Sequence, residues 1–158
     1  MLCPHCKRQG TLVLHGYLYG YGEKTLEKRG RRIFCNNRKM SEGCGKTFSF
    51  LLADWLRGFT LFARYLLNYL KKIKEGHTPH SAAGAAKMKI CTSSIYRIHN
   101  RFINNQSRIR TFLCRVKSPP PLLATQDPVV ASITHLTEVF PQHGINRFQH
   151  YFQQPFLV

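Results

Sequence analysis

Residues 3–6 read Cys-Pro-His-Cys, and two further cysteines follow at Cys35 and Cys44. Zinc needs four soft ligands in a tetrahedron, and a Cys-x-x-Cys turn supplies two thiolates from one tight loop. This spacing predicts a structural zinc ion bound by Cys3, Cys6, Cys35 and Cys44, because four thiolates leave no open position for water or substrate. Disulfide bonds are the alternative, which a basic cytosolic protein disfavours.

The second cysteine pair is irregular. Eight residues, 36–43, separate Cys35 from Cys44, where a compact turn would have two. We interpret them as a loop insertion that still lets the two sulfur atoms converge. His5 is an alternative ligand, but its place between the two cysteines of one turn favours an outward side chain.

Strand-like runs lie between and after the cysteines. Residues 11–19, 31–34 and 46–51 partly alternate apolar and polar side chains, and glycines separate the runs at turn positions. Two cysteine-bearing turns that close a small antiparallel sheet make a zinc ribbon, which we predict for residues 1–52.

The stretch 81–102 reads SAAGAAKMKICTSSIYRIHNRF. A helix-turn-helix needs small residues where its two helices cross, and apolar anchors on the second helix. Residues 82–86 supply the small side chains, and Ile95, Ile98 and Phe102 recur at helical spacing. These features predict a helix-turn-helix, with a solvated helical hairpin as the alternative.

The helical domain is expected to span residues 53–117. Its first helix should run from Thr60 to about Glu75, and Thr92 or Ser93 should cap the second helix of the helix-turn-helix. The fold class predicted for the whole chain is therefore α+β, a zinc ribbon followed by a helix-turn-helix bundle and a short helical tail.

The sequence makes specific predictions for three residues of this domain, Lys89, Cys91 and Cys114. Lys89 occupies the turn position where glycine usually takes a positive φ, so the turn is expected to be strained or built differently. Cys91 and Cys114 have no partner at ligand spacing, and we expect them to be buried free thiols that pack as small apolar groups.

The candidate DNA-binding residues follow from the helical periodicity. If Ile95 and Ile98 face inward, a polar set faces mostly outward: Ser93, Ser94, Tyr96, Arg97, Asn100 and Arg101. Arginine pairs with guanine and asparagine with adenine in the major groove, while serine reaches phosphate. These six residues are therefore the predicted contacts to double-stranded DNA.

The charge balance favours a polyanionic partner. The chain has 158 residues, with 24 Lys and Arg against 7 Asp and Glu, a net charge of +17. Residues 118–158 hold only one arginine and two acidic residues, so the excess lies in residues 1–117. Such an excess attracts nucleic acid.

An enzymatic role is not expected. Two-metal phosphoryl transfer needs clustered carboxylates, whereas the seven acidic residues are scattered along the chain. The eight histidines form no H-x-x-x-H pair, and no nucleophile elbow accompanies them.

Four stretches of the sequence together resemble zinc-ribbon plus helix-turn-helix DNA-binding proteins of bacterial insertion elements. They are CPHC at residues 3–6, RRIFC at 31–35, GCGKTFSF at 43–50 and SIYRI at 94–98. The resemblance covers about residues 1–117 and is to the N-terminal module of transposases, without their acidic catalytic domain. It implies four zinc-binding cysteines, recognition of element DNA and a role in transposition, recombination or transcription regulation.

The last part of the chain, residues 118–158, begins with Ser118 and three prolines, a stiff break. Two short amphipathic helices are expected after it, the first containing Val129 to Phe140 and the second Ile145 to Phe152. This tail either docks onto a recombinase, a transposase or a second copy of the chain, or folds back onto the rest of the protein.

Apolar stretches are interrupted by charged residues, so no membrane span is expected, and the immediate N-terminal cysteine motif leaves no room for a signal peptide. A cytoplasmic, nucleoid-associated protein is the resulting expectation. The alternative function is an RNA- or ribosome-associated zinc-ribbon protein, for which basic charge and aromatic residues such as Tyr19, Phe34 and Phe48 would also suit.

Overall fold

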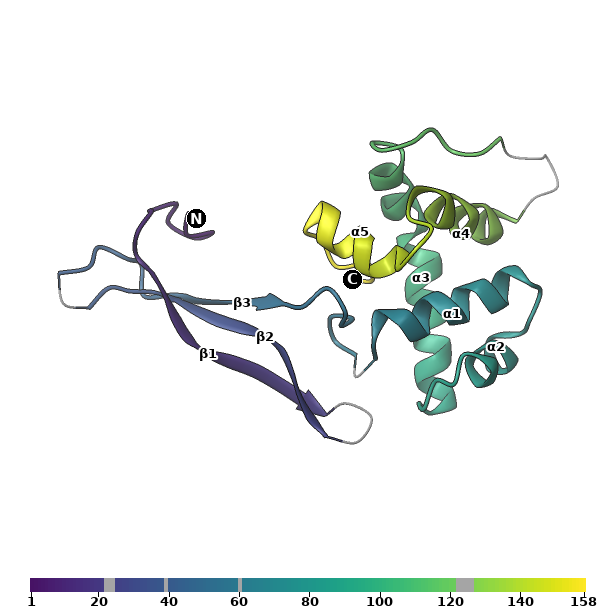
Figure 1. Ribbon diagram of the computed structural model, residues 1–158, viewed down its shortest axis with the longest axis horizontal. Helices are drawn as coiled ribbons and strands as arrows, with labels where there is room; N and C mark the ends of the chain where they lie inside the picture. The colour runs from purple at the N-terminus through teal and green to yellow at the C-terminus, as the bar shows by residue number, and fades with distance from the viewer. Residues whose placement is uncertain (22–24, 39, 60, 122–126) are drawn as a thin grey trace. The chain divides into compact units, whose positions relative to one another are not determined.

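The computed structural model describes residues 1–21, 25–38, 40–59, 61–121 and 127–158. Within these residues the chain is an α+β protein with a three-stranded antiparallel sheet and five helices (Figure 1). It divides into two compact units, Met1–Leu52 and Ala53–Val158. The strands belong to the first unit and the helices to the second.

The sheet has the order β1-β2-β3, with each strand antiparallel to its neighbour. The strands are β1 (Leu12–Tyr21), β2 (Leu26–Cys35) and β3 (Thr47–Leu51). All three predicted strands are confirmed, but β2 starts at Leu26 instead of the expected Arg31. The added residues show no apolar alternation, and they are strand because their backbone pairs with β1 beyond the end of β3.

The helices are α1 (Ala63–Lys74), α2 (Pro79–Ala85), α3 (Thr92–Leu113), α4 (Pro128–Val139) and α5 (Gly144–Phe152).

Local signals fix several helix ends. Thr78 caps α2 by accepting a hydrogen bond from the Ser81 amide, and Asp127 caps α4 through the Val129 amide. The helix predicted to start at Thr60 begins at Ala63, and Thr60 itself lies outside the described residues.

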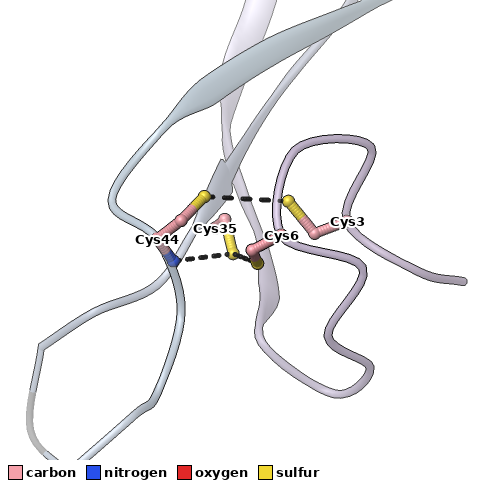
Figure 2. Close-up of side chains that lie close together, drawn as sticks. All are labelled: Cys3, Cys6, Cys35 and Cys44. Atoms are coloured by element: carbon pink, nitrogen blue, oxygen red, sulfur yellow. Dashed lines mark hydrogen bonds between the residues drawn. The ribbon is translucent and has the colours of Figure 1, made fainter.

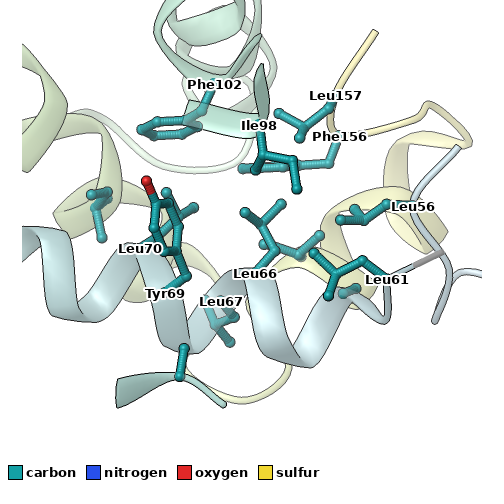
Figure 3. Packing of buried hydrophobic residues seen from close by; sticks show 14 of the residues in the cluster. Leu56, Leu61, Leu66, Leu67, Tyr69, Leu70, Ile98, Phe102, Phe156 and Leu157 are labelled. Atoms are coloured by element: carbon teal, nitrogen blue, oxygen red, sulfur yellow. The ribbon is translucent and has the colours of Figure 1, made fainter. Parts of the chain in front are cut away.

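One apolar core holds the helical unit together (Figure 3). Side chains from α1 and α3 meet in it, and the figure shows Leu66, Tyr69 and Leu70 of α1 opposite Ile98 and Phe102 of α3. These five side chains are at most 1% exposed. The helical spacing of Ile95, Ile98 and Phe102 therefore placed the inward face of α3 correctly.

The C-terminal residues fold back into this core, which is one of the two alternatives that the sequence left open. Phe156 and Leu157 are buried among the side chains of α1 and α3 (Figure 3). Arg108 of α3 donates hydrogen bonds to the carbonyl oxygens of Pro155 (2.7 Å) and Phe156 (2.9 Å). Residues 128–158, which the sequence analysis set apart as a tail, thus belong to the same compact unit as residues 53–117.

A buried glutamine joins the two ends of the helical unit. The Gln149 side-chain amide donates to the carbonyl oxygens of Ala53 (2.6 Å) and Trp55 (3.2 Å). Its oxygen accepts a hydrogen bond from the Phe156 amide (3.0 Å). All three bonds lie in or beside the core, so Gln149 satisfies backbone groups that burial would otherwise leave unpaired.

Cys91 and Cys114 are free thiols, as expected, but the expectation that they are buried was wrong. Cys91 and Cys114 are exposed, because they lie at the two ends of α3 and not on its inward face.

In the part of the chain that the structure describes, no helix is long and apolar enough to cross a membrane.

Candidate metal centre and nucleic-acid interface

The four N-terminal cysteines come together at one end of the sheet. The sulfur atoms of Cys3, Cys6, Cys35 and Cys44 all lie within 4.8 Å of one another (Figure 2). Cys3 Sγ is 3.8 Å from Cys44 Sγ, and Cys6 Sγ is 3.7 Å from Cys35 Sγ. All four are free thiols, and together they could hold a metal ion. His5 is exposed and lies outside the cluster.

The first cysteine pair lies on a tight turn before β1. The Lys7 amide donates to the Cys3 carbonyl oxygen (2.9 Å), and the Cys3 amide donates to the Arg8 carbonyl oxygen (3.0 Å). Lys7 has a φ of 62°, the left-handed conformation that closes this turn.

The second pair repeats this backbone pattern. The Gly45 amide donates to the Cys35 carbonyl oxygen (3.0 Å), the Cys35 amide donates to the Lys46 carbonyl oxygen (2.9 Å), and Gly45 has a φ of 70°. The residue after the second cysteine is thus left-handed in both turns and bonds back to the first cysteine. The two halves of the site are equivalent turns despite their different lengths.

The eight-residue insertion is closed at its base, which explains how this equivalence survives. The Gly43 amide donates to the Asn36 carbonyl oxygen (2.8 Å), so the loop leaves and returns at one point. The Arg8 side chain also reaches the insertion, where it bonds the Glu42 carbonyl oxygen and forms an ion pair with its carboxylate. The predicted convergence of the Cys35 and Cys44 sulfurs is confirmed.

Hydrogen bonds to sulfur lower the pKa of two of the four cysteine thiols. The Thr11 hydroxyl (3.2 Å) and the Cys44 amide (3.3 Å) both lie against Cys35 Sγ, and together they lower the pKa of Cys35. The Cys6 backbone amide is the main cause that lowers the pKa of Cys3 to about 6. Both shifts favour the thiolate, which is the form of cysteine that binds a metal.

Cys44 differs from its partners. The Lys46 amide lowers its pKa, but burial and the neighbouring Cys35, Cys3 and Cys6 sulfurs outweigh this bond and raise the pKa to about 11. A metal must displace the proton of Cys44, so metal affinity is expected to fall as the pH falls.

A substitution in the insertion tests whether its closed base matters. A Cβ on Gly43 would collide with the Asn36 carbonyl group, so Gly43→Ala must open the loop and move Cys44. We expect this variant to weaken metal affinity by about 1–3 kcal/mol, measured by competition with a chromophoric chelator. Ser41→Ala in the same loop is the matched control, and equal affinities for the two variants would contradict the prediction.

The predicted DNA-binding residues lie on the first half of α3. Ile95 and Ile98 are buried, as expected, while Ser93, Tyr96, Arg97 and Asn100 are exposed. The two remaining candidates, Ser94 and Arg101, are only partly exposed.

Two of these candidates, Arg97 and Arg101, lie over the ring of Phe59, a residue that the sequence did not single out. The guanidinium carbon of Arg97 is 5.5 Å from the ring centre of Phe59, and that of Arg101 is 5.0 Å away. Phe59 is buried in the loop before α1. Nothing local in the sequence signals this role, because Phe59 lies 38 positions before Arg97 and their contact depends on the packing of the loop on α3.

The turn between α2 and α3 is built differently from the expectation. Lys87, not Lys89, has the positive φ, at 55°. Its amide donates to the Gly84 carbonyl oxygen (3.0 Å), which ends α2. Cys91, not Thr92 or Ser93, takes the N-cap position of α3. Six residues, 86–91, therefore separate the two helices.

Comparisons with known proteins do not extend this description. No family model matches the chain, and neither a curated protein nor a solved structure matches it. The findings define an α+β protein with a four-cysteine cluster that could hold a metal ion.

Proposed function

We propose that this chain is a sequence-specific, double-stranded DNA-binding protein of a mobile genetic element. It would read DNA through a helix-turn-helix formed by α2 and α3, with a structural zinc ribbon in residues 1–52. It would act without catalysis of its own, as an accessory factor of transposition or recombination or as a transcription regulator. It would be cytoplasmic and associated with the nucleoid.

The sulfur geometry supports zinc as the metal. A zinc ion about 2.3 Å from each of four tetrahedral sulfurs would hold them about 3.8 Å apart. The Cys3–Cys44 and Cys6–Cys35 sulfur separations, 3.8 Å and 3.7 Å, agree with this value. An all-thiolate donor set also suits zinc better than magnesium or calcium, which prefer oxygen.

The observation that carries the DNA-binding proposal is the pairing of α2 with α3. Ala82, Ala83 and Ala86 are buried, which lets the short α2 approach α3 closely. The opposite side of α3 leaves Arg97 and Asn100 exposed for a ligand. A helix that is anchored on one side and polar on the other suits insertion into the major groove.

Charge near the start of α3 adds to this support. Lys87 and Lys89 are both exposed in the turn before α3, and Arg57 is exposed in the same unit. Cations that flank a recognition helix contact phosphates and fix its register on the duplex. Since the net charge is +17, these contacts should dominate nonspecific affinity.

An RNA- or ribosome-associated role is the second candidate, and the aromatic residues of the sheet favour it. Tyr19 is exposed, whereas Phe34 and Phe48 are half-buried. Exposed rings beside cations are typical of proteins that bind unpaired RNA bases. A clear preference for single-stranded RNA over duplex DNA under matched conditions would favour this role.

The recognition helix is tested with Arg97. We expect Arg97→Ala to lower affinity for the cognate site by about 1–3 kcal/mol and to leave nonspecific binding largely intact, because a base contact carries sequence information. The cognate site is first obtained by selection from a random duplex library. Each variant is then titrated against cognate and scrambled duplexes.

Lys71 is the matched comparison, because it is exposed on α1 and is expected to see phosphate at most. Lys71→Ala should weaken both duplexes alike and reduce the salt dependence of binding. If Arg97→Ala and Lys71→Ala lose equal affinity on both duplexes, the recognition-helix assignment is wrong.

A further inference from the structure

One face of the sheet carries a row of exposed aromatic rings with cations between them. In the strand register Tyr17 of β1 is opposite Arg31 of β2, which is opposite Phe50 of β3. Directly opposed residues point to the same face of a sheet, so these three side chains share one face. Tyr17 and Phe50 are each 43% exposed, which is unusual for large rings on a sheet.

Two neighbouring aromatic residues extend this row. The ring of Tyr19 is 6.3 Å from that of Tyr17, and the ring of Phe48 is 5.4 Å from that of Phe50. Tyr19 is 57% exposed. These four aromatic residues, Tyr17, Tyr19, Phe48 and Phe50, form an aromatic face together with Lys28 and Arg31.

The two cations of this face lie over aromatic rings. Lys28 Nζ is 3.6 Å from the ring centre of Tyr17, and the guanidinium carbon of Arg31 is 5.9 Å from it. Both cations are exposed, so they remain free to contact a phosphate while they rest on the ring. Aromatic surface and positive charge therefore occur in one patch, within reach of a single ligand.

We propose that the aromatic face binds unpaired bases of single-stranded DNA. Tyr17, Tyr19 and Phe50 would stack on successive bases, and Lys28 and Arg31 would contact the phosphates between them. Every base has a π-face, so this binding would tolerate many sequences. It is distinct from the duplex-binding surface of α3, because a duplex hides the faces of its bases inside the stack.

The chemistry of the patch favours this ligand over an apolar protein surface. A protein that covered the rings would also bury Lys28 and Arg31, and unpaired charges are costly to remove from water. A single strand supplies a negative phosphate beside each base. The choice of DNA over RNA rests on the proposed function, since recombination and transposition expose unpaired DNA strands.

Binding of a fluorescein-labelled oligo(dT) to the full-length protein, followed by anisotropy, tests the proposal. Oligo(dT) forms no duplex with itself, so stacking is measured directly. We expect Tyr17→Leu to weaken binding about ten-fold, and Tyr17→Phe to retain it, because stacking needs the ring and not the hydroxyl. Tyr151→Leu is the matched control, since Tyr151 is an exposed tyrosine of α5.

A parallel titration with duplex DNA separates this proposal from the proposed function. Arg97→Ala should weaken binding to the cognate duplex and leave oligo(dT) binding unchanged, whereas Tyr17→Leu should do the reverse. Unchanged oligo(dT) affinity in Tyr17→Leu would overturn the inference even if duplex binding behaves as proposed. Tighter binding of oligo(U) than of oligo(dT) would overturn the assignment to DNA.

Discussion

Replacement of Cys35 by serine is expected to abolish metal binding and to unfold residues 1–52. Cys35 Sγ is 3.7 Å from Cys6 Sγ and accepts a hydrogen bond from the Cys44 amide (3.3 Å). Among the described residues of this unit only Cys3, Thr11, Gly30 and Cys35 are buried, so the unit has almost no apolar core. Metal binding, worth about 10–16 kcal/mol in small zinc modules, must therefore supply much of its folding free energy.

Two measurements check this outcome. Metal analysis should find about one zinc per wild-type chain and none in Cys35→Ser. Limited digestion with trypsin should then cut the variant throughout residues 1–52, which are rich in lysine and arginine.

The helical unit supplies an internal control for the same experiment. Trp55 is the only tryptophan of the chain and is buried in that unit, so its fluorescence should not change. Cys114→Ser changes an exposed cysteine outside the cluster and should keep the metal. A Cys35→Ser protein that retains one zinc per chain would contradict the assignment of the site.

Phe156→Ala is expected to destabilise the helical unit by about 3–5 kcal/mol. The Phe156 ring is fully buried. Its centre lies 6.1 Å from that of the Phe102 ring in a stacked arrangement, and 5.2 Å from that of the Phe148 ring in an edge-to-face arrangement. Its removal leaves a cavity, because Arg108 and Gln149 still hold the backbone of residue 156 in place. The surrounding side chains are therefore prevented from closing the gap.

Urea unfolding followed by Trp55 fluorescence measures this loss. Val158→Ala, two residues further along the chain, is the matched control, because Val158 is 62% exposed. The control should change the free energy of unfolding by less than about 0.5 kcal/mol. Equal unfolding midpoints for the two variants would show that the C-terminal residues do not stabilise this core.

The sequence by itself determined the features that depend on local spacing. The Cys3–Cys6 turn and the inward positions of Ile95, Ile98 and Phe102 follow from a short motif and a 3.6-residue period. The starts of α2 and α4 depend on signals of the same local kind, since a capping residue and a proline act on the adjacent backbone. The physical reason is that each of these signals operates within one or two turns of chain.

Only the tertiary structure decided the features that depend on distant segments. The Cys44 sulfur reaches the other three, as predicted, because Gly43 and Asn36 close the insertion, a backbone contact that the sequence did not indicate. The return of Phe156 to the core required Arg108 and Gln149, and the position of Arg97 required Phe59. The exposed positions of Cys91 and Cys114 depended on where α3 begins and ends. In the helical unit such contacts are set by the burial of a shared apolar core, which no local pattern specifies.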